Sequence, residues 1–203
     1  MSASTTADLI LASTSRYRAE LLRRLRVPFI QRAPDVDESR QSAEAPQDLA
    51  LRLAAEKAFA IARGAPGHWV IGSDQVCVLG DAVLGKPGTH AAAVQQLQRL
   101  SGCRAVFHTA VCVIAPDGSE QLRNCPTEVQ FRHLSPAEIE TYLRLDKPYD
   151  CAASARSESL GPALLQSMRS DDPTALIGLP LIAVCDMLRA SGFDVLARAA
   201  RSA

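Results

Sequence analysis

The chain has 203 residues, of which 47% are hydrophobic and 22% are charged, the balance of an ordinary soluble globular protein. Its 22 basic side chains equal its 22 acidic ones, so the formal net charge is zero, and only 4% of the residues are aromatic. Because such a surface has no general attraction for polyanions, we expect neither nucleic acid nor a membrane as a partner, and any phosphate recognition must be local.

In chain order, the hydrophobic pattern predicts strands that alternate with helices. The predicted strands lie at 8–13, at 68–80 and, on either side of an Asp117-Gly118 turn, within 104–134. The predicted helices lie at 15–27, 46–64, 89–102, 135–144 and 178–192, the fourth with a capping box of Ser135 and Glu138. The 33–46 and 150–163 segments are predicted loops, and the residues after about 192 receive no function and are expected to fray. The pattern predicts a mixed α/β protein.

The six cysteines form no C-x-x-C pair and no Cys/His cluster, so we do not expect a structural zinc site. The sequence shows neither a basic and then apolar leader nor an apolar run of about 18 residues. We therefore expect a reducing, cytoplasmic location.

The segment "GDAVLGKP" at 80–87 is nearly a phosphate-binding P-loop. A P-loop requires Ser or Thr after its lysine, because that hydroxyl binds the Mg²⁺ of the nucleotide. Pro87 has neither a hydroxyl nor a backbone N–H. Because Gly85 and Pro87 restrict the backbone, we interpret the segment as a loop that holds the Lys86 ammonium group at a set place.

Asp74 lies in the strand-like run "HWVIGSDQVCVLG", where an unpaired carboxylate would be costly to bury. It could cap a turn with Ser73 or pair with a lysine. Asp37 and Glu38, on the preceding loop, could join it to give three carboxylates, whose oxygens suit a hard cation such as Mg²⁺.

Two lysines could complete a site for a Mg²⁺-triphosphate by binding phosphate oxygens. One is Lys86. The other is Lys57 in "AAEKAFA", which alone could equally be a surface lysine paired with Glu56.

The segment that joins the first strand to the first helix contains Ser13, Ser15 and Arg18. Hydroxyls, an arginine and the amides of a helix N-terminus form an anion site. Either serine could instead be a simple N-cap, with the arginines on a solvated face.

Together these motifs resemble one family. The segments "LILASTSRYRAELL", "VDES", "AAEKA", "VIGSDQVCVL", "LGKP", "LSG", "FRHLS", "SLG" and "GLPL" occur in the order found in Maf-like nucleoside triphosphate pyrophosphatases. The resemblance runs from about residue 9 to about residue 190. It implies one domain over 1–203, with a mixed sheet, flanking helices and two lobes around a central cleft. It also implies a divalent cation, Mg²⁺ or Mn²⁺, and a possible homodimer.

The activity that the resemblance implies is hydrolysis between the α and β phosphates of a nucleotide, which releases pyrophosphate. By position, Asp74 matches the family's proton acceptor, and Asp74 and Glu38 are the expected metal ligands. The polar groups of the triphosphate pocket are matched by Ser13, Arg18, Glu38, Lys57 and Lys86.

Three further positions bear on the nucleotide base. Where the dTTP and UTP branch of the family has Arg, Thr and Gln, this chain has Tyr17, Gln75 and Glu158, so it looks like the branch that acts on N7-methyl-GTP. A carboxylate at Glu158 accepts from both donors of the guanine edge, and an aromatic ring at Tyr17 favours a cationic methylated base. Tyr17 could instead pack on its helix, and Glu158 could be a solvated loop carboxylate.

Two other functions stay open on the sequence. One is hydrolysis of dTTP or UTP by the same chemistry. The other is a nucleotide-binding regulator of septum formation and cell division, since the family carries that association. An aspartate placed as a base favours an enzyme, because a pure binder has no need of one.

Overall fold

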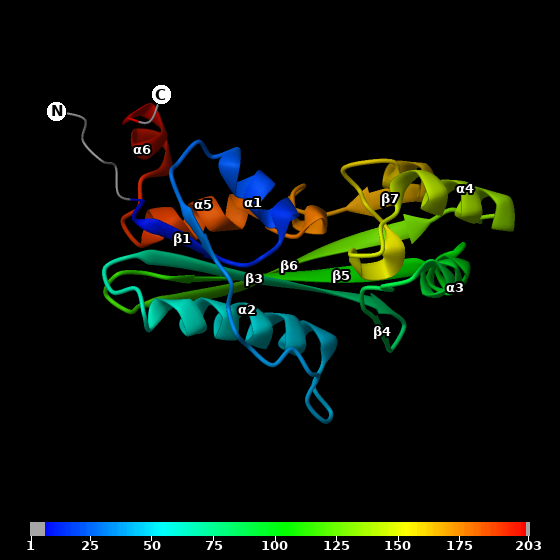
Figure 1. The fold of residues 1–203 in the computed structure, drawn as a ribbon, viewed down its shortest axis with the longest axis horizontal. Coiled ribbons are helices and arrows are strands. Elements are labelled where there is room, and N and C mark those ends of the chain that lie inside the picture. Colours follow the sequence, from blue (N-terminus) through cyan, green and yellow to red (C-terminus); the bar gives the residue numbers. More distant parts are fainter. Residues whose placement is uncertain (1–6, 202–203) are drawn as a thin grey trace.

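A computed structural model describes residues 7–201, and within them the chain forms a seven-stranded mixed sheet with helices on both faces (Figure 1). The strands are β1 (Leu9–Ala12), β2 (Ile30–Arg32), β3 (Trp69–Leu79), β4 (Ala82–Leu84), β5 (Arg104–Ile114), β6 (Glu120–Phe131) and β7 (Leu165–Arg169). Their order is β2-β1-β3-β5-β6-β7, with β4 paired to β3. β1 runs parallel to β2 and β3, and the other pairs are antiparallel. The predicted mixed α/β fold is confirmed.

The helices are α1 (Arg16–Arg23), α2 (Pro46–Ala62), α3 (His90–Leu100), α4 (Pro136–Asp146), α5 (Leu181–Ala190) and α6 (Val195–Arg201). Short 3₁₀ turns occupy Ala152–Ser154, Gly161–Leu164 and Ala175–Ile177. The capping box predicted for α4 is present, since the Ser135 hydroxyl accepts from the Glu138 amide and the Glu138 carboxylate accepts from the Ser135 amide at 2.8 Å.

The long strands β3, β5 and β6 pass through two lobes (Figure 1). In the first lobe, α1 and α5 pack on one face of the sheet and α2 packs on the other. Each face has its own apolar core. The second lobe contains α3, α4, β4, β7 and the 147–164 segment, around a core that includes Phe107, Phe131 and Leu143. Buried on both sides, β1 is wholly apolar, as expected for an inner parallel strand.

The sequence did not predict β2, β4, β7 or α6. The three-residue strands β2 and β4 are too short for a visible alternation, and β7 is an exposed edge strand. The segment after about residue 192, for which fraying was expected, is ordered and packed as far as residue 201. Phe193 is buried edge-on against Trp69, with ring centroids 5.2 Å apart, and the Arg198 guanidinium contacts the Asp8 carboxylate at 2.6 Å.

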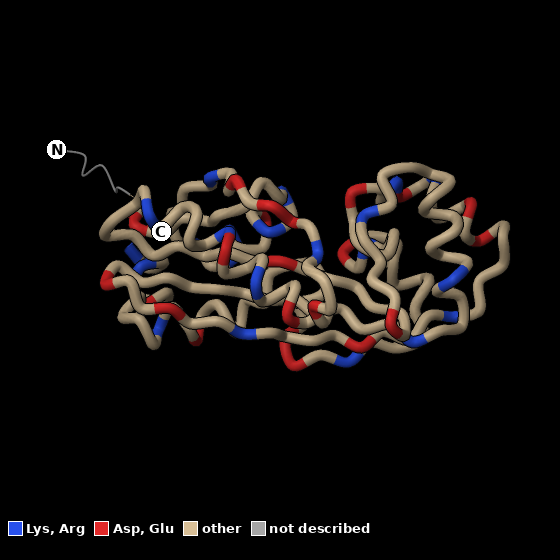
Figure 2. The backbone as a smooth tube through the Cα atoms, turned by 90° about the horizontal axis from the view of Figure 1, so that it is seen from below, with Lys and Arg blue, Asp and Glu red and all other residues tan. Residues whose placement is uncertain are grey.

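Acidic and basic residues are interspersed along the backbone of both lobes (Figure 2). This distribution agrees with the zero net charge of the sequence. Across residues 7–201, none of the helices has the length and apolarity needed to cross a bilayer.

α2 lies unusually close to β3 at Gly72. A Cβ atom built on Gly72 would overlap the Ala54 carbonyl oxygen and lie 2.6 Å from the Ala58 amide nitrogen. Only glycine permits this approach. As a result Lys57, next to Ala58, reaches the carboxylate of Asp74, two residues beyond Gly72.

An interruption in the strand pairing leaves the edge of β3 open beside this contact. β1 pairs with β3 only as far as Gly72, and β4 begins to pair at Cys77. Among the described strands, none lies beside residues 73–76 on this edge. β1 and β3 are parallel, so the chain leaves the carboxyl end of β1 and enters α1 at the same opening, the place where α/β sheets bind ligands.

We expect the Gly72→Ala variant to be less stable by about 3 kcal/mol, because the added methyl group must separate α2 from β3. The free energy of unfolding from urea denaturation tests this. Gly64→Ala is the matched control, since a Cβ there meets only the Ile61 carbonyl oxygen at 3.9 Å. It should change stability by less than about 1 kcal/mol. Equal effects of the two variants would show that the close approach at Gly72 does not limit packing.

Candidate active site

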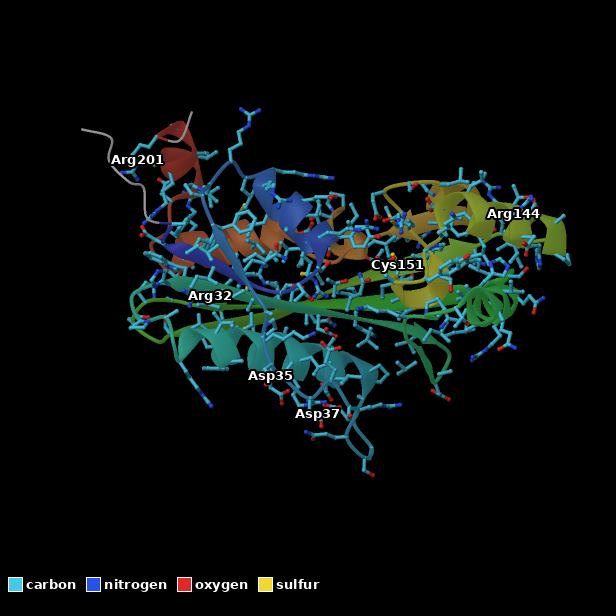
Figure 3. The ribbon with its side chains drawn as sticks, in the orientation of Figure 1. Arg32, Asp35, Asp37, Arg144, Cys151 and Arg201 are labelled. Atoms are coloured by element: carbon cyan, nitrogen blue, oxygen red, sulfur yellow. The ribbon has the colours of Figure 1, made fainter. Side chains whose placement is uncertain are left out.

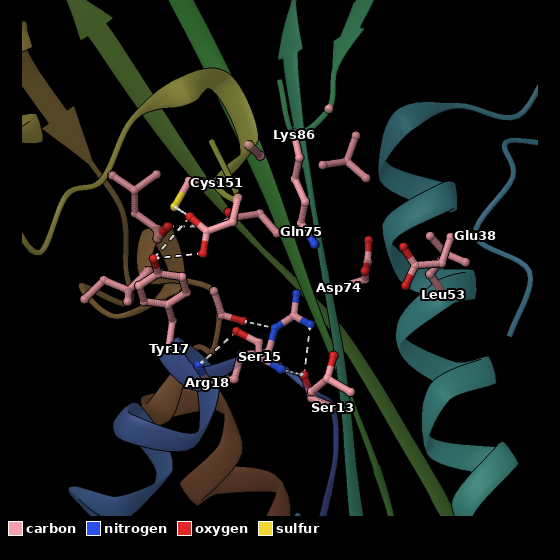
Figure 4. A pocket seen from close by; sticks show the side chains of 18 of the residues that line it. Ser13, Ser15, Tyr17, Arg18, Glu38, Leu53, Asp74, Gln75, Lys86 and Cys151 are labelled. Atoms are coloured by element: carbon pink, nitrogen blue, oxygen red, sulfur yellow. Dashed lines mark hydrogen bonds between the residues drawn. The ribbon is translucent and has the colours of Figure 1, made fainter. Parts of the chain in front are cut away.

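A cavity of about 630 Å³ lies between the lobes at the open edge of β3 (Figure 4). Its wall comes from the β1–α1 connection and the start of α1, the loop before α2, α2, β3, β4 and the segment after it, the 150–158 loop and the turn at 176–178. All nine side chains predicted for the site line it: Ser13, Tyr17, Arg18, Glu38, Lys57, Asp74, Gln75, Lys86 and Glu158. Their individual roles stay predictions.

The β1–α1 connection folds around Ser13. The buried Ser13 hydroxyl accepts from the Ser15 amide at 3.1 Å and from Arg18 Nη1 at 3.4 Å. Ser15 caps α1 by accepting from the Arg18 amide, and Arg18 Nε donates to the Gly178 carbonyl at 2.9 Å. Burial lowers the pKa of Arg18, and the charges of Asp74 and Glu38 oppose that shift. These contacts hold the guanidinium in the cavity, facing Asp74 (Figure 4).

Lys57 connects two carboxylates in the cavity. Its ammonium group lies 2.6 Å from Asp74 Oδ1 and 2.5 Å from Glu38 Oε1. Lys57 is 5% exposed and Asp74 is 8% exposed, so the interpretation of Lys57 as a surface lysine paired with Glu56 is wrong. Glu56 instead pairs with Arg52.

Glu38 is the more exposed of the two carboxylates. Partial burial works against its ionisation, but the hydrogen bond and charge of Lys57, together with Lys86 and Arg18, outweigh that cost. The pKa of Glu38 is therefore below its ordinary value.

The "GDAVLGKP" segment is a β-hairpin and not a P-loop. Gly80 takes a positive φ of 59° at the turn between β3 and β4, and Lys86 follows the end of β4. The Lys86 side chain extends into the cavity toward Asp74 (Figure 4). Lys86 is exposed, and within residues 7–201 it makes no ion pair.

The expected group of three carboxylates does not form. Asp37 is exposed, accepts from the Ser39 amide at 2.9 Å and does not line the cavity, although Glu38 does (Figure 3). In the described part of the chain, no group of three or more His, Cys, Asp or Glu side chains is arranged for a metal. Two carboxylates, Glu38 and Asp74, remain. This set fits Mg²⁺, which proteins often bind through one or two carboxylates plus substrate phosphates.

At the other end of the cavity, Tyr17 bridges the lobes. Its hydroxyl donates to the Asp150 carboxylate at 3.1 Å and accepts from Arg16 Nη2 at 2.6 Å. Burial is the main cause that raises the pKa of Tyr17, to about 12, so the hydroxyl stays protonated. Cys151 lies beside Asp150 in the same wall (Figures 3 and 4). The Tyr17 ring also contacts its own helix, since Arg16 Cζ of α1 lies 4.7 Å from the ring centroid.

Glu158 lines the cavity with a quarter of its side chain exposed. Its Oε1 lies 3.8 Å from Arg156 Nε. Burial raises the pKa of Glu158, the nearby Asp146 adds to the increase, and the charge of Arg156 opposes it. The alternative of an exposed loop residue is met for Glu158 as a whole, although three quarters of its side chain is enclosed by the cavity wall.

Gln75 has a mainly structural set of contacts. Its Nε2 lies 2.9 Å from Thr109 Oγ1 and 3.0 Å from the carbonyl oxygens of Ala175 and Leu176. These bonds fix the 175–177 turn against the sheet, so the amide nitrogen is occupied while the side chain lines the wall.

Sequence reasoning missed Arg16, Asp150, Arg156 and the Gly178 carbonyl. Arg16 and Gly178 lie within segments quoted for the family resemblance, but no role was assigned to them there. Asp150 and Arg156 belong to no motif, and they reach the site through contacts between segments far apart in the chain. The one usable signal was the concentration of charged residues around the 150–158 loop.

Comparison with known proteins places the chain in a family. The family model of the Maf-like protein matches residues 8–191, and the chain belongs to this family. It is 56% identical to a protein of Albidiferax ferrireducens named 7-methyl-GTP pyrophosphatase, over 93% of this chain and 95% of that one. A protein of the same name from Cupriavidus metallidurans is 53% identical, over 95% and 98% of the two chains.

Among solved structures, the chain is similar to a nucleoside-triphosphatase / dITP/XTP pyrophosphatase from Mycobacterium abscessus. The identity is 18%, the TM-score is 0.46, and the match covers 90% of this chain and 95% of the other.

We expect Lys57→Met to lower the free energy of unfolding by about 3 kcal/mol, because it leaves a buried carboxylate without its cation. Lys86→Met should change stability by no more than about 0.5 kcal/mol, since Lys86 is exposed. Urea denaturation of both variants measures the difference. Similar stability of the two would show that the Lys57–Asp74 contact does not contribute to the fold.

Proposed function

We propose that this protein hydrolyses 7-methyl-GTP to 7-methyl-GMP and pyrophosphate. The observation that carries the proposal is that the two ends of the cavity have opposite character. Arg18, Lys57 and Lys86 supply cations around Asp74 at one end, and Glu158 with Tyr17 supplies a carboxylate and an aromatic ring at the other. The names of the relatives support the same substrate.

The cationic end suits the triphosphate. Lys86 and Arg18 point into the space beside Asp74, where ammonium and guanidinium groups can bind phosphate oxygens (Figure 4). As pyrophosphate leaves, negative charge grows on it, and these fixed cations stabilise the transition state more than the ground state.

Asp74 is the proposed base. Its Oδ1 is held by Lys57, so the carboxylate has a fixed position at the open strand edge. It would orient a water molecule or take its proton while the oxygen attacks the α-phosphorus, and the P–O bond to pyrophosphate breaks. Lys57 here positions the base.

Glu38 and Asp74 would hold the divalent cation. A bound Mg²⁺ or Mn²⁺ supplies neutralisation of phosphate charge. Both carboxylates contact Lys57, whose single positive charge offsets one of their two negative charges and leaves one for a bound cation to neutralise.

The other end suits a 7-methylguanine base. A carboxylate at Glu158 can accept from both donors of the guanine edge, whereas it would repel the acceptor oxygens of uracil or thymine. Methylation at N7 makes the base cationic, which favours an anionic contact and an aromatic ring. The proposed role is removal of a modified nucleotide before it enters nucleic acid.

The substrate assignment predicts metal-dependent release of pyrophosphate from 7-methyl-GTP well above that from GTP, UTP or dTTP. Asp74→Asn should reduce kcat by about 10²–10⁴-fold or more, because both the base and one of the two proposed metal ligands are lost. A pyrophosphate assay with Mg²⁺ and with chelator measures both. Preference for UTP or dTTP would keep the chemistry and overturn the assignment. No release from any of the four would favour the nucleotide-binding regulator.

The raised pKa of Glu158 predicts a pH dependence for base recognition. A carboxylate binds the cationic base only when ionised, so recognition is present above this pKa and lost as the pH falls through it. The KM for 7-methyl-GTP should therefore rise on acidification, from a higher pH than an ordinary glutamate would give. Glu158→Gln should abolish this rise of KM at acidic pH. It should also impair 7-methyl-GTP hydrolysis far more than UTP hydrolysis. Equal losses on both substrates would contradict the role of Glu158.

A further inference from the structure

Arg156 lies at the centre of a group of charges behind the base end of the cavity. Its Nη1 donates to the Asp146 carbonyl at 3.0 Å and lies 3.7 Å from Asp146 Oδ1. Its Nη2 donates to Asp150 Oδ1 at 3.4 Å. The Arg156 side chain is 15% exposed and does not line the cavity. The guanidinium therefore connects the end of α4 to the 150–158 loop from inside the wall.

The same guanidinium reaches both side chains proposed to read the base. Its Nε is 3.8 Å from Glu158 Oε1, and its Cζ is 5.4 Å from the centroid of the Tyr17 ring. Glu158 belongs to the second lobe, whereas Tyr17 comes from α1 of the first lobe. Arg156 thus fixes the distance across the cavity between an anion and an aromatic ring.

The hydrogen bonding around Arg156 is incomplete. In the described part of the chain, three neighbouring buried atoms have no hydrogen-bond partner: Asp146 Oδ2, Arg156 Nε and Ser157 Oγ. The gap between Arg156 Nε and Glu158 Oε1 is within ion-pair range but beyond hydrogen-bond distance. A small movement of Glu158 would close it. Such unpaired donors and acceptors are costly when buried, so they favour a state in which the loop tightens.

The charges of this group also fit a cationic base. Two cations, Arg16 and Arg156, face three carboxylates, those of Asp146, Asp150 and Glu158, which leaves one negative charge in excess. Without Arg156, the carboxylates would repel one another, and Asp146 already raises the pKa of Glu158. Glu158 would then take up a proton more easily and lose the charge that the base requires.

We propose that Arg156 is a positioning residue for base recognition, which holds Glu158 ionised and in register with Tyr17 without touching the substrate. This inference rests on the proposed hydrolysis of 7-methyl-GTP. It assigns to the wall behind the cavity a share of the selectivity for a methylated, cationic base.

The test measures kcat and KM for 7-methyl-GTP and UTP in the wild type, Arg156→Gln, Arg156→Lys and the control Arg144→Gln. Arg144 is an exposed arginine in the last turn of α4, outside the cavity (Figure 3). Inhibition by inorganic triphosphate reports the phosphate end alone. Thermal unfolding shows whether each variant is folded at the assay temperature.

We expect Arg156→Gln to raise the KM for 7-methyl-GTP by about tenfold or more, the size of one lost charge-assisted contact, with a much smaller change in kcat. The KM for UTP and the inhibition constant of triphosphate should stay within about twofold. Arg156→Lys should recover part of the loss, because it restores the charge but not the planar fork. Arg144→Gln should behave as the wild type.

A uniform loss on both substrates, with weaker triphosphate inhibition or a lowered melting temperature, would overturn the inference and make Arg156 a structural residue only. If Arg156→Gln does not fold, Arg156→Lys decides: a KM for 7-methyl-GTP equal to that of the wild type overturns the inference, and a selective increase supports it. A wild type that releases no pyrophosphate from 7-methyl-GTP overturns the proposed function itself, which is a separate result.

Discussion

The contact between Lys57 and Asp74 determines where the rest of the cavity can lie. Both groups are nearly enclosed, and neither could be buried alone without a large cost in desolvation. Their pairing requires α2 to approach β3, and the bare backbone of Gly72 permits that approach. Glu38 then reaches the other side of the same ammonium group and brings the loop before α2 to the cavity. One ion pair thereby fixes the relation of a helix, a strand and a loop.

The strand edge explains why both faces of the sheet contribute to one site. Consecutive residues of a strand point to opposite faces. Asp74 points toward α2 and Lys57, whereas Ser73 and Gln75 contact the 175–178 turn on the other face. Because β1 ends before this point and β4 begins after it, the cavity can extend around the edge of β3. If another strand were paired to β3 along residues 73–76, a cavity on one face of the sheet would contact only the side chains that point to that face.

The sequence predicts the secondary structure and fold class of this protein better than the contacts between its side chains. The hairpin at Gly118, the capping box of α4 and the strand position of Asp74 follow from local patterns that depend on few neighbours. The burial of Lys57 does not follow from a local pattern, because it depends on Gly72 in β3. Asp37 and Glu38 are adjacent in a loop without a regular period, so only the folded chain shows which of them faces inward.

The 150–158 loop, beside Tyr17 and Glu158, was also difficult to interpret from local sequence patterns. Asp150 and Arg156 carry no motif, and their importance arises from Tyr17, which is distant in the chain. The family resemblance located the nine lining residues because it matches many short segments in a fixed order along the whole chain. The 175–177 turn and α6 were missed because packing against other elements stabilises them more than their own sequence does.

The long central strands have a consequence for how this architecture can diversify. β3, β5 and β6 run unbroken through both lobes, so the lobes share one rigid sheet. The groups around Asp74 come from residues before 90, whereas most of the opposite end comes from the 150–158 loop. If the two ends act as proposed, changes confined to that short loop and the start of α1 would alter nucleotide preference while leaving the residues around Asp74 unchanged. On the proposed assignment, base preference is therefore a trait that can evolve separately from the chemistry.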